Sequence, residues 1–545
     1  MSASPSERIA KWTALALLVV AAAWHGLRPL VDLDVWWQLK LGEQILATQT
    51  LVDRDPFSFT FADTPWPYKD AGAAVIMWLL WTLGGSAALV IAKAVLLVVT
   101  VVMVFQLLHR VRGLAFAPAL VGSALAFEAL AFRFSERPAS VAITATVLVL
   151  VLVERDRRDR RGLWWSVLVT AVLANLHRSA VLLPLLLGAH AAVCTLEAKL
   201  LGQSRRWQRA WAIAIAAAIA TLATPFGLAI YTTTATLVDA HAAMMTEWAP
   251  PTYELVRALS PASFGTALLA VLAIVLGLAR SPRAWWDVVL ATMALALGSQ
   301  ALRHLPLLAI FAVGPGMTAI AARSEVWTGR LRHVIACGAA MIALVAQLAR
   351  PLATPSLGLT PAHYPERGLA FVRSLAPELR PRGPLFHEFA YGGFFIFHLW
   401  PDHRVYIDGR TDLVYPSSFV ARWLAATSDP RVFAEETERW DLQWVWLDNA
   451  PFRGARAFFD RDPRWALVHV SQRSLIYVRR DGDNAVLAEQ AYRWLSPHDL
   501  TGSLARAHAQ GRLDAALGEL ERMIAEDPDN PYPQAVLAQL HQTSH

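Results

Sequence analysis

The stretch "RPLVDLDVWWQLKLGEQIL", residues 28–46, follows directly on a long apolar run. It places two carboxylates, Asp32 and Asp34, one residue apart and sets two indoles, Trp36 and Trp37, immediately behind them. The indoles suit an interfacial aromatic belt, but an acid pair is not needed to anchor a helix end. The stretch therefore predicts the mouth of a membrane helix with ionisable groups above it.

The composition is that of a membrane protein. The 545 residues are 55% apolar and only 17% charged, below the roughly 25% of soluble domains. The two cysteines, Cys194 and Cys337, fall in apolar segments, which excludes a disulfide framework or a cysteine-based metal cluster. The net charge of +6 does not indicate a nucleic-acid partner, because most basic residues lie in short loops between apolar runs.

These runs predict an α-helical polytopic domain over residues 1–350 with about eleven crossings of roughly 20 residues each. The runs are 12–30, 72–108, 114–131, 139–153, 163–176, 180–197, 210–224, 263–279, 286–300, 305–321 and 333–350. The 72–108 run is too long for one crossing. Its Gly84–Gly85 pair predicts a break, and we interpret the first piece as interfacial or re-entrant. The number of helices stays open there and across 225–262.

The distribution of Arg and Lys indicates on which side of the membrane each loop lies. With the N-terminus inside, the loops on that side are "HRVRG" (109–113), "ERDRRDRRG" (154–162), "EAKLLGQSRRWQR" (197–209), "ARSPR" (279–283) and "ARSEVWTGRLR" (322–332). All are rich in Arg and Lys, as cytoplasmic loops are, whereas the first outer loop, 31–70, has seven acidic and three basic residues. We therefore predict a multi-pass protein of a bacterial inner membrane with a cytoplasmic N-terminus and a periplasmic C-terminal third. The first segment does not have the pattern of a cleaved signal peptide.

The chain changes character after the last apolar run. Residues 351–495 predict a soluble α/β domain, in which helices alternate with short strands at "GPLFHEF", "HRVYIDGR", "LQWVWLD" and "ALVHVSQRSLIYVRR". Residues 496–545 resemble one tetratricopeptide unit and part of a second. One unit cannot bury its own apolar face, so we expect the tail to pack on the α/β domain or on a partner protein.

Polar groups gather at the predicted outer ends of the spans. The residues concerned are Arg133, Glu136, Arg137, His177, Arg178, Glu247, Arg303 and His304. Ionisable groups near bilayer depth are costly unless they are paired or line a water-filled cavity, so we expect one outward-facing cavity there. The alternative is that Arg and His snorkel to headgroups, that Trp36, Trp37 and Trp248 form a belt, and that the Pro-containing ends are helix punctuation.

This cavity suits group transfer from a lipid phosphate. Asp32 or Asp34 would act as a general base or orient an acceptor, while Arg and His would neutralise charge on a phosphate leaving group. Trp36 and Trp37 would offer a flat surface to a sugar ring or an isoprenoid chain. Alternatively, the two aspartates would hold a divalent cation such as Mg²⁺ or Mn²⁺, for which further oxygen ligands are needed.

These residues resemble the bacterial GT-C-type membrane glycosyltransferase-like family. Its first outer loop commonly reads D-x-D-x-W-W-H-L-x-x-G-x-x-I, then D-P-F-S, then P-W-x-x-x-E-W. The matching segments are "DLDVWWQLKLGEQIL", "DPFSFT", "PWPYKDAGAAVIMWLLWTLGG", "RFSERP", "NLHRS", "ATPFGLAIY", "EWAPP", "RHLPLLAIFAVGP" and "FAYGGFFIFHLWPDHRVYIDGRTDLV", within residues 28–425. The resemblance implies a GT-C fold, a polyprenyl-phosphate-linked sugar donor and a catalytic acid at Asp34 or Asp32, of which we prefer Asp34. It also implies phosphate-side roles for Arg137 and Arg303, and an acceptor- or phosphate-side role for His177.

The sequence departs from the family pattern in two places. Gln38 replaces the usual His after the tryptophans, and Tyr68-Lys69-Asp70 replaces the usual acid-aromatic motif. Both departures remove ionisable groups that an active member would use. In the C-terminal domain, a loop with Asp408, Arg410 and Asp412 either helps to bind the acceptor or is a turn whose Asp–Arg pair fixes the domain; we favour the turn.

Three classes of function follow. The first is a glycosyltransferase that moves a sugar from a polyprenyl-phosphate carrier to an envelope glycan, lipid or protein on the outer face. The second is a non-catalytic GT-C-like scaffold for envelope assembly that binds a protein through its helical tail. The third, a polyprenyl-lipid transporter, needs polar residues through the whole bilayer depth, whereas here they gather at one face.

Overall fold

A computed structural model describes the chain in eleven segments. They are residues 5–66, 70–159, 161–202, 206–232, 246–279, 284–323, 331–350, 354–360, 363–410, 414–449 and 456–543. The chain forms two compact units. The helical unit comprises Met1–Asp32, Leu41–Leu51 and Pro67–Leu359, and the C-terminal unit comprises Leu33–Lys40, Val52–Trp66 and Thr360–His545. Tyr68, Lys69 and Asp412 lie outside the described residues.

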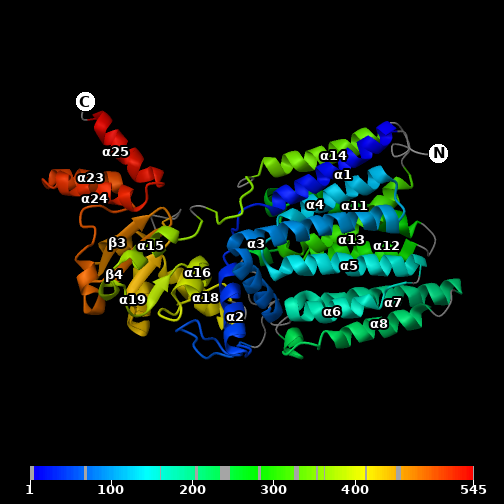
Figure 1. The fold of residues 1–545 in the computed structure, drawn as a ribbon, viewed down its shortest axis with the longest axis horizontal. Coiled ribbons are helices and arrows are strands. Elements are labelled where there is room, and N and C mark those ends of the chain that lie inside the picture. The colour runs from blue at the N-terminus through cyan, green and yellow to red at the C-terminus, as the bar shows by residue number, and fades with distance from the viewer. Residues whose placement is uncertain are drawn as a thin grey trace. The chain divides into compact units, whose positions relative to one another are not determined.

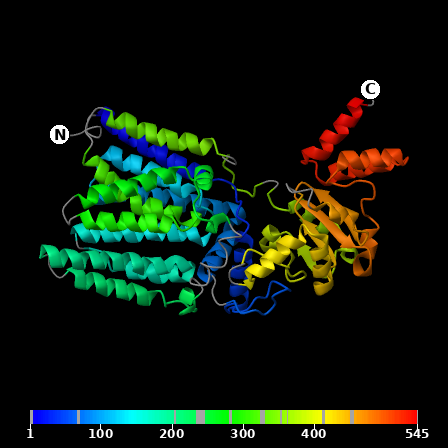
Figure 2. The ribbon, with the colours of Figure 1, turned by 180° about the vertical axis from the view of Figure 1, so that it is seen from behind.

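The helical unit is built from long apolar helices that run alongside one another (Figures 1 and 2). Its helices are α1 (Pro5–Gly26), α3 (Ala71–Gln106), α4 (Phe116–Ala131), α5 (Pro138–Asp159), α6 (Trp165–Leu176), α7 (Leu182–Leu201), α8 (Arg206–Ala220), α10 (Tyr253–Leu259), α11 (Ala262–Leu278), α12 (Trp285–Gly298), α13 (Leu305–Ala321) and α14 (Arg332–Leu348). Short turns flank them: η1 (Leu107–Val111), η2 (Arg178–Val181), η3 (Thr246–Trp248) and η5 (Leu302–His304).

Several of these helices can cross a membrane. Within the described residues, five are long and apolar enough, and a bent pair formed by α10 and α11 makes a sixth. The predicted multi-pass membrane protein is therefore confirmed. Further apolar helices, among them α4 and α12, are shorter, so the predicted count of about eleven crossings stays a prediction.

The predicted break in the long apolar run of α3 is present. Gly84 and Gly85 have non-helical backbone angles, and Gly85 has φ 58° and ψ −141°. A side chain at such a positive φ is sterically disfavoured, so glycine permits the kink there. Small residues also let helices approach closely elsewhere, because a Cβ added at Gly316 on α13 would meet the backbone of Leu269 on α11.

The C-terminal unit contains a small mixed sheet. Its strands, β1 (Leu385–His387), β2 (Trp444–Leu447), β3 (Trp465–Ser471) and β4 (Ser474–Arg479), lie in the order β1-β2-β4-β3. β1 pairs with β2 in parallel, and the other pairs are antiparallel. The remaining helices are α15 (Glu366–Ser374), α16 (Gly392–Leu399), α18 (Ser417–Ala426), α19 (Pro430–Trp440), α21 (Phe458–Arg461) and α22 (Ala485–Ala488).

The strand predicted at "HRVYIDGR" is wrong. Val405 makes only an isolated bridge with Ser58, and no regular strand forms there. The partner comes from the first loop, which is itself partly helical: α2 spans Val35–Thr48. The sequence run was extended and apolar enough for a strand, but its hydrogen-bonding partner is a loop instead of a sheet edge.

The helical tail comprises α23 (Leu500–Ala509), α24 (Leu513–Glu526) and α25 (Pro531–Thr543). α24 packs on β3 of the same unit. Arg522 Nη2 donates to the carbonyl oxygen of Val468 at 2.6 Å, and Glu526 Oε2 accepts from the amide of Val470 at 3.2 Å. Of the two expected packing partners, the α/β domain is therefore the one that this face of the tail contacts.

Candidate functional site

Short turns at the ends of the helices carry the polar residues of the helical unit. Asp32 follows α1, the segment with Arg133 and Arg137 joins α4 to α5, and Glu247 and Arg303 lie on η3 and η5. Ser, Pro and charged residues end the apolar runs at these points, so the side chains leave the helix axes and can converge. The structure brings most of the predicted group together.

Asp32 forms hydrogen bonds with the segment between α4 and α5. Its Oδ2 atom accepts a hydrogen bond from Arg137 Nε, and another from Ser135 Oγ at 3.1 Å. The side chain is buried, and it forms an ion pair with Arg137. A carboxylate in a charge-assisted pair of this kind fixes the direction of the guanidinium.

Glu247 is the centre of the arginine cluster, which we define as Arg133, Arg137, Arg303 and Glu247. Its carboxylate lies 2.6 Å from Arg133 Nη1, 3.6 Å from Arg303 Nη1 and 3.7 Å from Arg137 Nη1. Burial alone would raise the pKa of Glu247, but the three guanidinium charges hold it below its ordinary value. With Asp32 included, three cations face two carboxylates, so the cluster keeps an excess of positive charge.

Contacts around the cluster hold its turns in place. Arg303 stacks over the Trp248 ring at 4.1 Å, and the amide of Leu302 donates to the carbonyl oxygen of Ala249 at 3.0 Å. These contacts tie η3 to η5. The indole of Trp248 thus has a role in this structure as a cation–π partner.

His177 and Arg178 lie at the end of α6. Burial lowers the pKa of His177 to about 3, and the charges of Arg178, Arg303 and Arg133 reinforce this shift. The imidazole is therefore neutral near pH 7, and its Nδ1 atom lies 2.7 Å from Ser179 Oγ. His304, which ends η5 next to Arg303, is partly buried.

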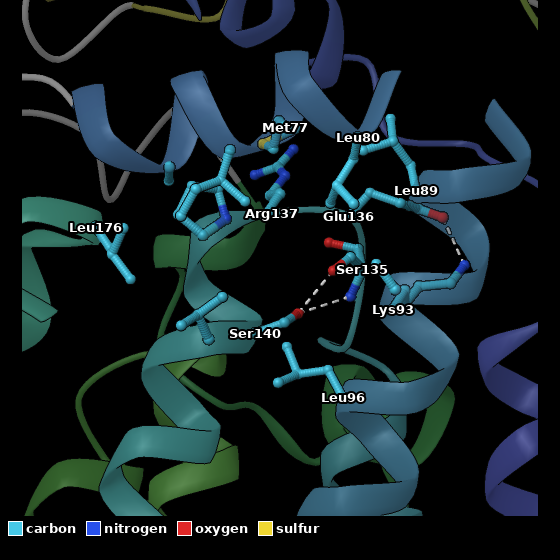
Figure 3. Close-up of a pocket in the computed structure, with 15 residues that line it drawn as sticks. Met77, Leu80, Leu89, Lys93, Leu96, Ser135, Glu136, Arg137, Ser140 and Leu176 are labelled. Carbon is cyan, nitrogen blue, oxygen red and sulfur yellow. Dashed lines mark hydrogen bonds and ion pairs between the residues drawn. The ribbon is translucent and has the colours of Figure 1, made fainter. Parts of the chain in front are cut away.

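An apolar pocket of about 110 Å³ opens beside Arg137 (Figure 3). Its lining is mostly aliphatic, and its charged residues are Lys93, Glu136 and Arg137. The lining residues are Ala73, Ile76, Met77, Leu80, Leu89, Ala92, Lys93, Leu96, Ser135, Glu136, Arg137, Pro138, Ser140, Val141 and Leu176.

Lys93 is the functional candidate that the sequence reasoning missed. Its Nζ atom lies 2.5 Å from Glu136 Oε1, and it also donates to the carbonyl oxygen of Arg28 at 3.0 Å. Burial raises the pKa of Glu136 although the charge of Lys93 opposes this. The signal was available, because Lys93 is the only charged residue in the apolar run 72–108 and such residues are costly without a role.

Asp34, Trp36 and Trp37 belong to the C-terminal unit. Asp34 directly precedes α2, where Asp is a favoured N-cap residue, and its side chain is partly exposed. Trp36 is 1% exposed and packs against the rings of Tyr364, Phe394, Phe397 and His398. The indole of Trp37 packs against Trp66. The aromatic pair therefore builds the core of this unit.

Asp408 and Arg410 are also in the core of the C-terminal unit. Arg410 forms ion pairs of 2.6 Å with both Asp408 and Asp55, and all three side chains are 0% exposed. This geometry agrees with a turn that fixes the domain, and Asp55 is a partner that the sequence did not indicate. Within the described segments, no group of three or more His, Cys, Asp or Glu side chains is arranged to hold a metal ion.

A scan against protein-family models finds no match, and neither does a search of curated proteins. Solved structures do match. The oligosaccharyltransferase AglB from Archaeoglobus fulgidus, in complex with an inhibitory peptide and a dolichol-phosphate, has a TM-score of 0.58 and 12% identity over 86% of this chain and 74% of its own. ArnT from Cupriavidus metallidurans, bound to undecaprenyl phosphate, has a TM-score of 0.51 and 12% identity over 89% of this chain and 99% of its own. The expected structural similarity to GT-C membrane glycosyltransferases is thus confirmed over most of the chain.

Proposed function

We propose that this protein is a bacterial inner-membrane glycosyltransferase. It transfers a sugar from a polyprenyl-phosphate-linked donor to an envelope glycan, lipid or protein on the outer face of the membrane. The shorter apolar helices complete the membrane domain, with the N-terminus cytoplasmic and the C-terminal unit periplasmic. The basic loops of the sequence support this orientation.

The observation that carries the proposal is the double position of Arg137. This side chain lines the apolar pocket, and it also pairs with Asp32 and approaches Glu247 in the arginine cluster. A polyprenyl phosphate has the matching chemistry, since it joins an apolar chain to an anionic headgroup. AglB and ArnT, which share the fold, were both solved with such a lipid phosphate.

The two aspartates have different roles in this proposal. Asp32 holds Arg137 through an ion pair, which orients the guanidinium within the arginine cluster. Asp34 is the more exposed of the two and is the base. The preference for Asp34 as the catalytic residue therefore rests on its greater exposure, since Asp32 is buried.

The reaction needs a proton acceptor and a stabilised leaving group. An acceptor hydroxyl attacks the anomeric carbon of the donor sugar, and the bond from that carbon to the phosphate oxygen breaks. Asp34 takes the hydroxyl proton, while polyprenyl phosphate departs with the electron pair. Arg133, Arg137 and Arg303 neutralise the charge that develops on the phosphate oxygen.

The test is a deletion strain complemented with wild type or with Asp34→Asn, expressed at matched membrane levels. Mass profiles of envelope glycans, glycolipids and glycoproteins are the readout. We expect one product to lose a sugar on deletion, and only wild type to restore it. Asp32→Asn is the companion variant, expected to weaken binding of undecaprenyl phosphate to the purified protein.

Two results would contradict the proposal. An unchanged glycan profile in the deletion strain would show that the protein is not the proposed transferase. Full restoration of the product by both Asp34→Asn and Asp32→Asn would show that neither aspartate is catalytic. A non-catalytic scaffold would then be the better proposal.

A further inference from the structure

The segment Leu33–Asp34 lies between two glycines of the C-terminal unit. A Cβ added at Gly393 would come within 2.8 Å of the carbonyl oxygen of Leu33, and one added at Gly409 would collide with Asp34 Oδ1. The Asp34 carboxylate is therefore packed directly on the Cα atom of Gly409. All four residues belong to the C-terminal unit.

The loop that carries Gly409 is held by backbone contacts on both sides. A Cβ at Gly392, at the start of α16, would collide with the carbonyl oxygen of Ile407. On the other side, the amide of Val405 donates to the carbonyl oxygen of Phe57 at 2.9 Å, and the amide of Phe59 donates to that of Val405 at 3.1 Å. The loop is thus fixed between α16 and the segment around Phe57.

A fully buried ion cluster fixes the end of this loop. The Arg410 guanidinium donates to Asp55 Oδ1 through Nη1 and to Asp408 Oδ2 through Nη2, both at 2.6 Å. Tyr415 donates to the same Asp408 oxygen at 2.7 Å. A buried guanidinium is tolerated only with full pairing, so this arrangement permits little movement of the residues beside it.

We infer that the turn Asp408–Gly409–Arg410 positions the Asp34 carboxylate, and that Gly409 is a positioning residue for the acid. The inference rests on the proposed function for the role of Asp34 as base. Arg410, buried between two carboxylates, anchors the turn without touching substrate. The glycine lets the turn approach the acid closely enough to set its direction.

Alanine at Gly409 is a clean probe of this contact. The φ angle of Gly409 lies outside the left-handed region that favours glycine, so alanine adds a methyl group without straining the backbone. The methyl must displace the Asp34 carboxylate or the turn. Gly518, on α24 in the same unit, has open space around it, and Gly518→Ala is the matched control.

The experiment compares wild type, Gly409→Ala, Gly518→Ala and Asp34→Asn as full-length protein. It measures the restored glycan product in the deletion strain, undecaprenyl phosphate binding by the purified protein, and labelling of Asp34 by a carbodiimide with glycine ethyl ester. For Gly409→Ala we expect about 10- to 100-fold less product, as for a 1 Å displacement of a reacting group. Lipid binding and membrane level stay unchanged, and Asp34 labelling rises several-fold relative to exposed Asp499. Arg410→Lys, which keeps the charge but loses the two-sided fork, changes product and labelling in the same direction.

The remaining outcomes distinguish failure of the positioning inference from failure of the proposed function. Wild-type product from Gly409→Ala overturns the inference, and so does a loss of product that is accompanied by loss of lipid binding, since that is general misfolding. A wild type that restores no product defeats the proposed function instead. Labelling then decides the positioning alone: unchanged Asp34 labelling overturns it, and increased labelling supports it.

Discussion

Each unit of the molecule contains a cluster in which arginines meet carboxylates, and the two clusters differ in burial and in charge balance. Around Glu247, the side chains of Arg133, Arg137 and Arg303 are 19%, 29% and 17% exposed. Around Arg410, the side chains of Asp55 and Asp408 are 0% exposed, and two carboxylates face one guanidinium. The cluster around Glu247 has more arginines than carboxylates, whereas the cluster around Arg410 has more carboxylates than arginines.

Burial and charge balance together separate binding from support. A partly exposed cluster with surplus cations can exchange its carboxylate for a ligand anion, because water and salt already weaken each pair. A fully buried and paired cluster cannot exchange partners, because any unpaired charge there is strongly destabilising. The same residue types therefore form a fixed turn in the C-terminal unit, whereas the cluster in the helical unit is the one we propose as the ligand site.

The largest effect is expected from Asp55→Ala. It leaves the Arg410 guanidinium one carboxylate short inside the core, which should cost about 3–5 kcal/mol of local stability. Protease susceptibility of the C-terminal unit in the purified full-length protein measures this opening. Asp529→Ala removes an aspartate that is also paired with an arginine but is 78% exposed, and it should change the susceptibility little. Equal effects of the two variants would mean that burial does not distinguish the clusters.

The same cluster has a pH dependence with a defined sign. Burial would raise the pKa of Asp408, but Arg410 and the hydrogen bonds hold it below its ordinary value. A carboxyl group with a lowered pKa stabilises the fold at pH values above its ordinary pKa, and this contribution is lost as the pH falls through the lowered pKa. Proteolysis of the C-terminal unit by an acid-active protease should therefore accelerate only when the pH falls below the ordinary aspartate range. Acceleration near neutral pH would contradict this.

An intermediate effect is expected from Arg137→Gln. Loss of a charge-assisted contact to the phosphate should weaken undecaprenyl phosphate binding about 10- to 100-fold. The melting temperature of the purified protein should also fall, because the buried Asp32 carboxylate loses its arginine partner. Arg506→Gln, in the exposed tail, is the control. An affinity like that of wild type would show that the arginine cluster does not hold the lipid headgroup.

The smallest effect is expected from Glu247→Gln, and it has the opposite sign. The Glu247 carboxylate competes with a phosphate for Arg133, Arg137 and Arg303, so its neutral isostere should bind undecaprenyl phosphate about 2- to 5-fold more tightly. Titrations at low and high salt with the purified protein measure the difference, which should shrink as salt screens the cluster. Weaker binding by Glu247→Gln would mean that the carboxylate supports the arginines instead of competing with the ligand.

Local features of the chain were predictable from the sequence. The apolar runs indicate membrane helices because the bilayer requires long apolar segments, and the glycine pair at Gly84–Gly85 indicates the kink in α3 because only glycine adopts that backbone freely. The polar helix ends also indicated which residues would gather: Arg133, Arg137, Glu247 and Arg303 do meet. The resemblance to GT-C proteins agrees with the fold.

Long-range partners were not predictable in this way. The pairing of Asp55 with Arg410 joins residues 355 positions apart, and Lys93 on α3 pairs with Glu136 in the segment between α4 and α5. The burial of Trp36 depends on Tyr364 and α16, which lie far along the chain. The spacing of apolar and polar residues within one segment does not indicate which distant segment it will contact.

By itself, the sequence determined that this is a multi-pass membrane protein with charged groups at the ends of its helices. Hydrophobicity and the cost of unpaired charge act on each short segment separately, so both can be read from a single stretch. Only the tertiary structure decided how those charges are used. In the folded protein Asp32 pairs with Arg137, arginines surround Glu247, and Asp34 packs against Gly409. Burial and pairing of these groups depend on which distant segments of the chain come into contact.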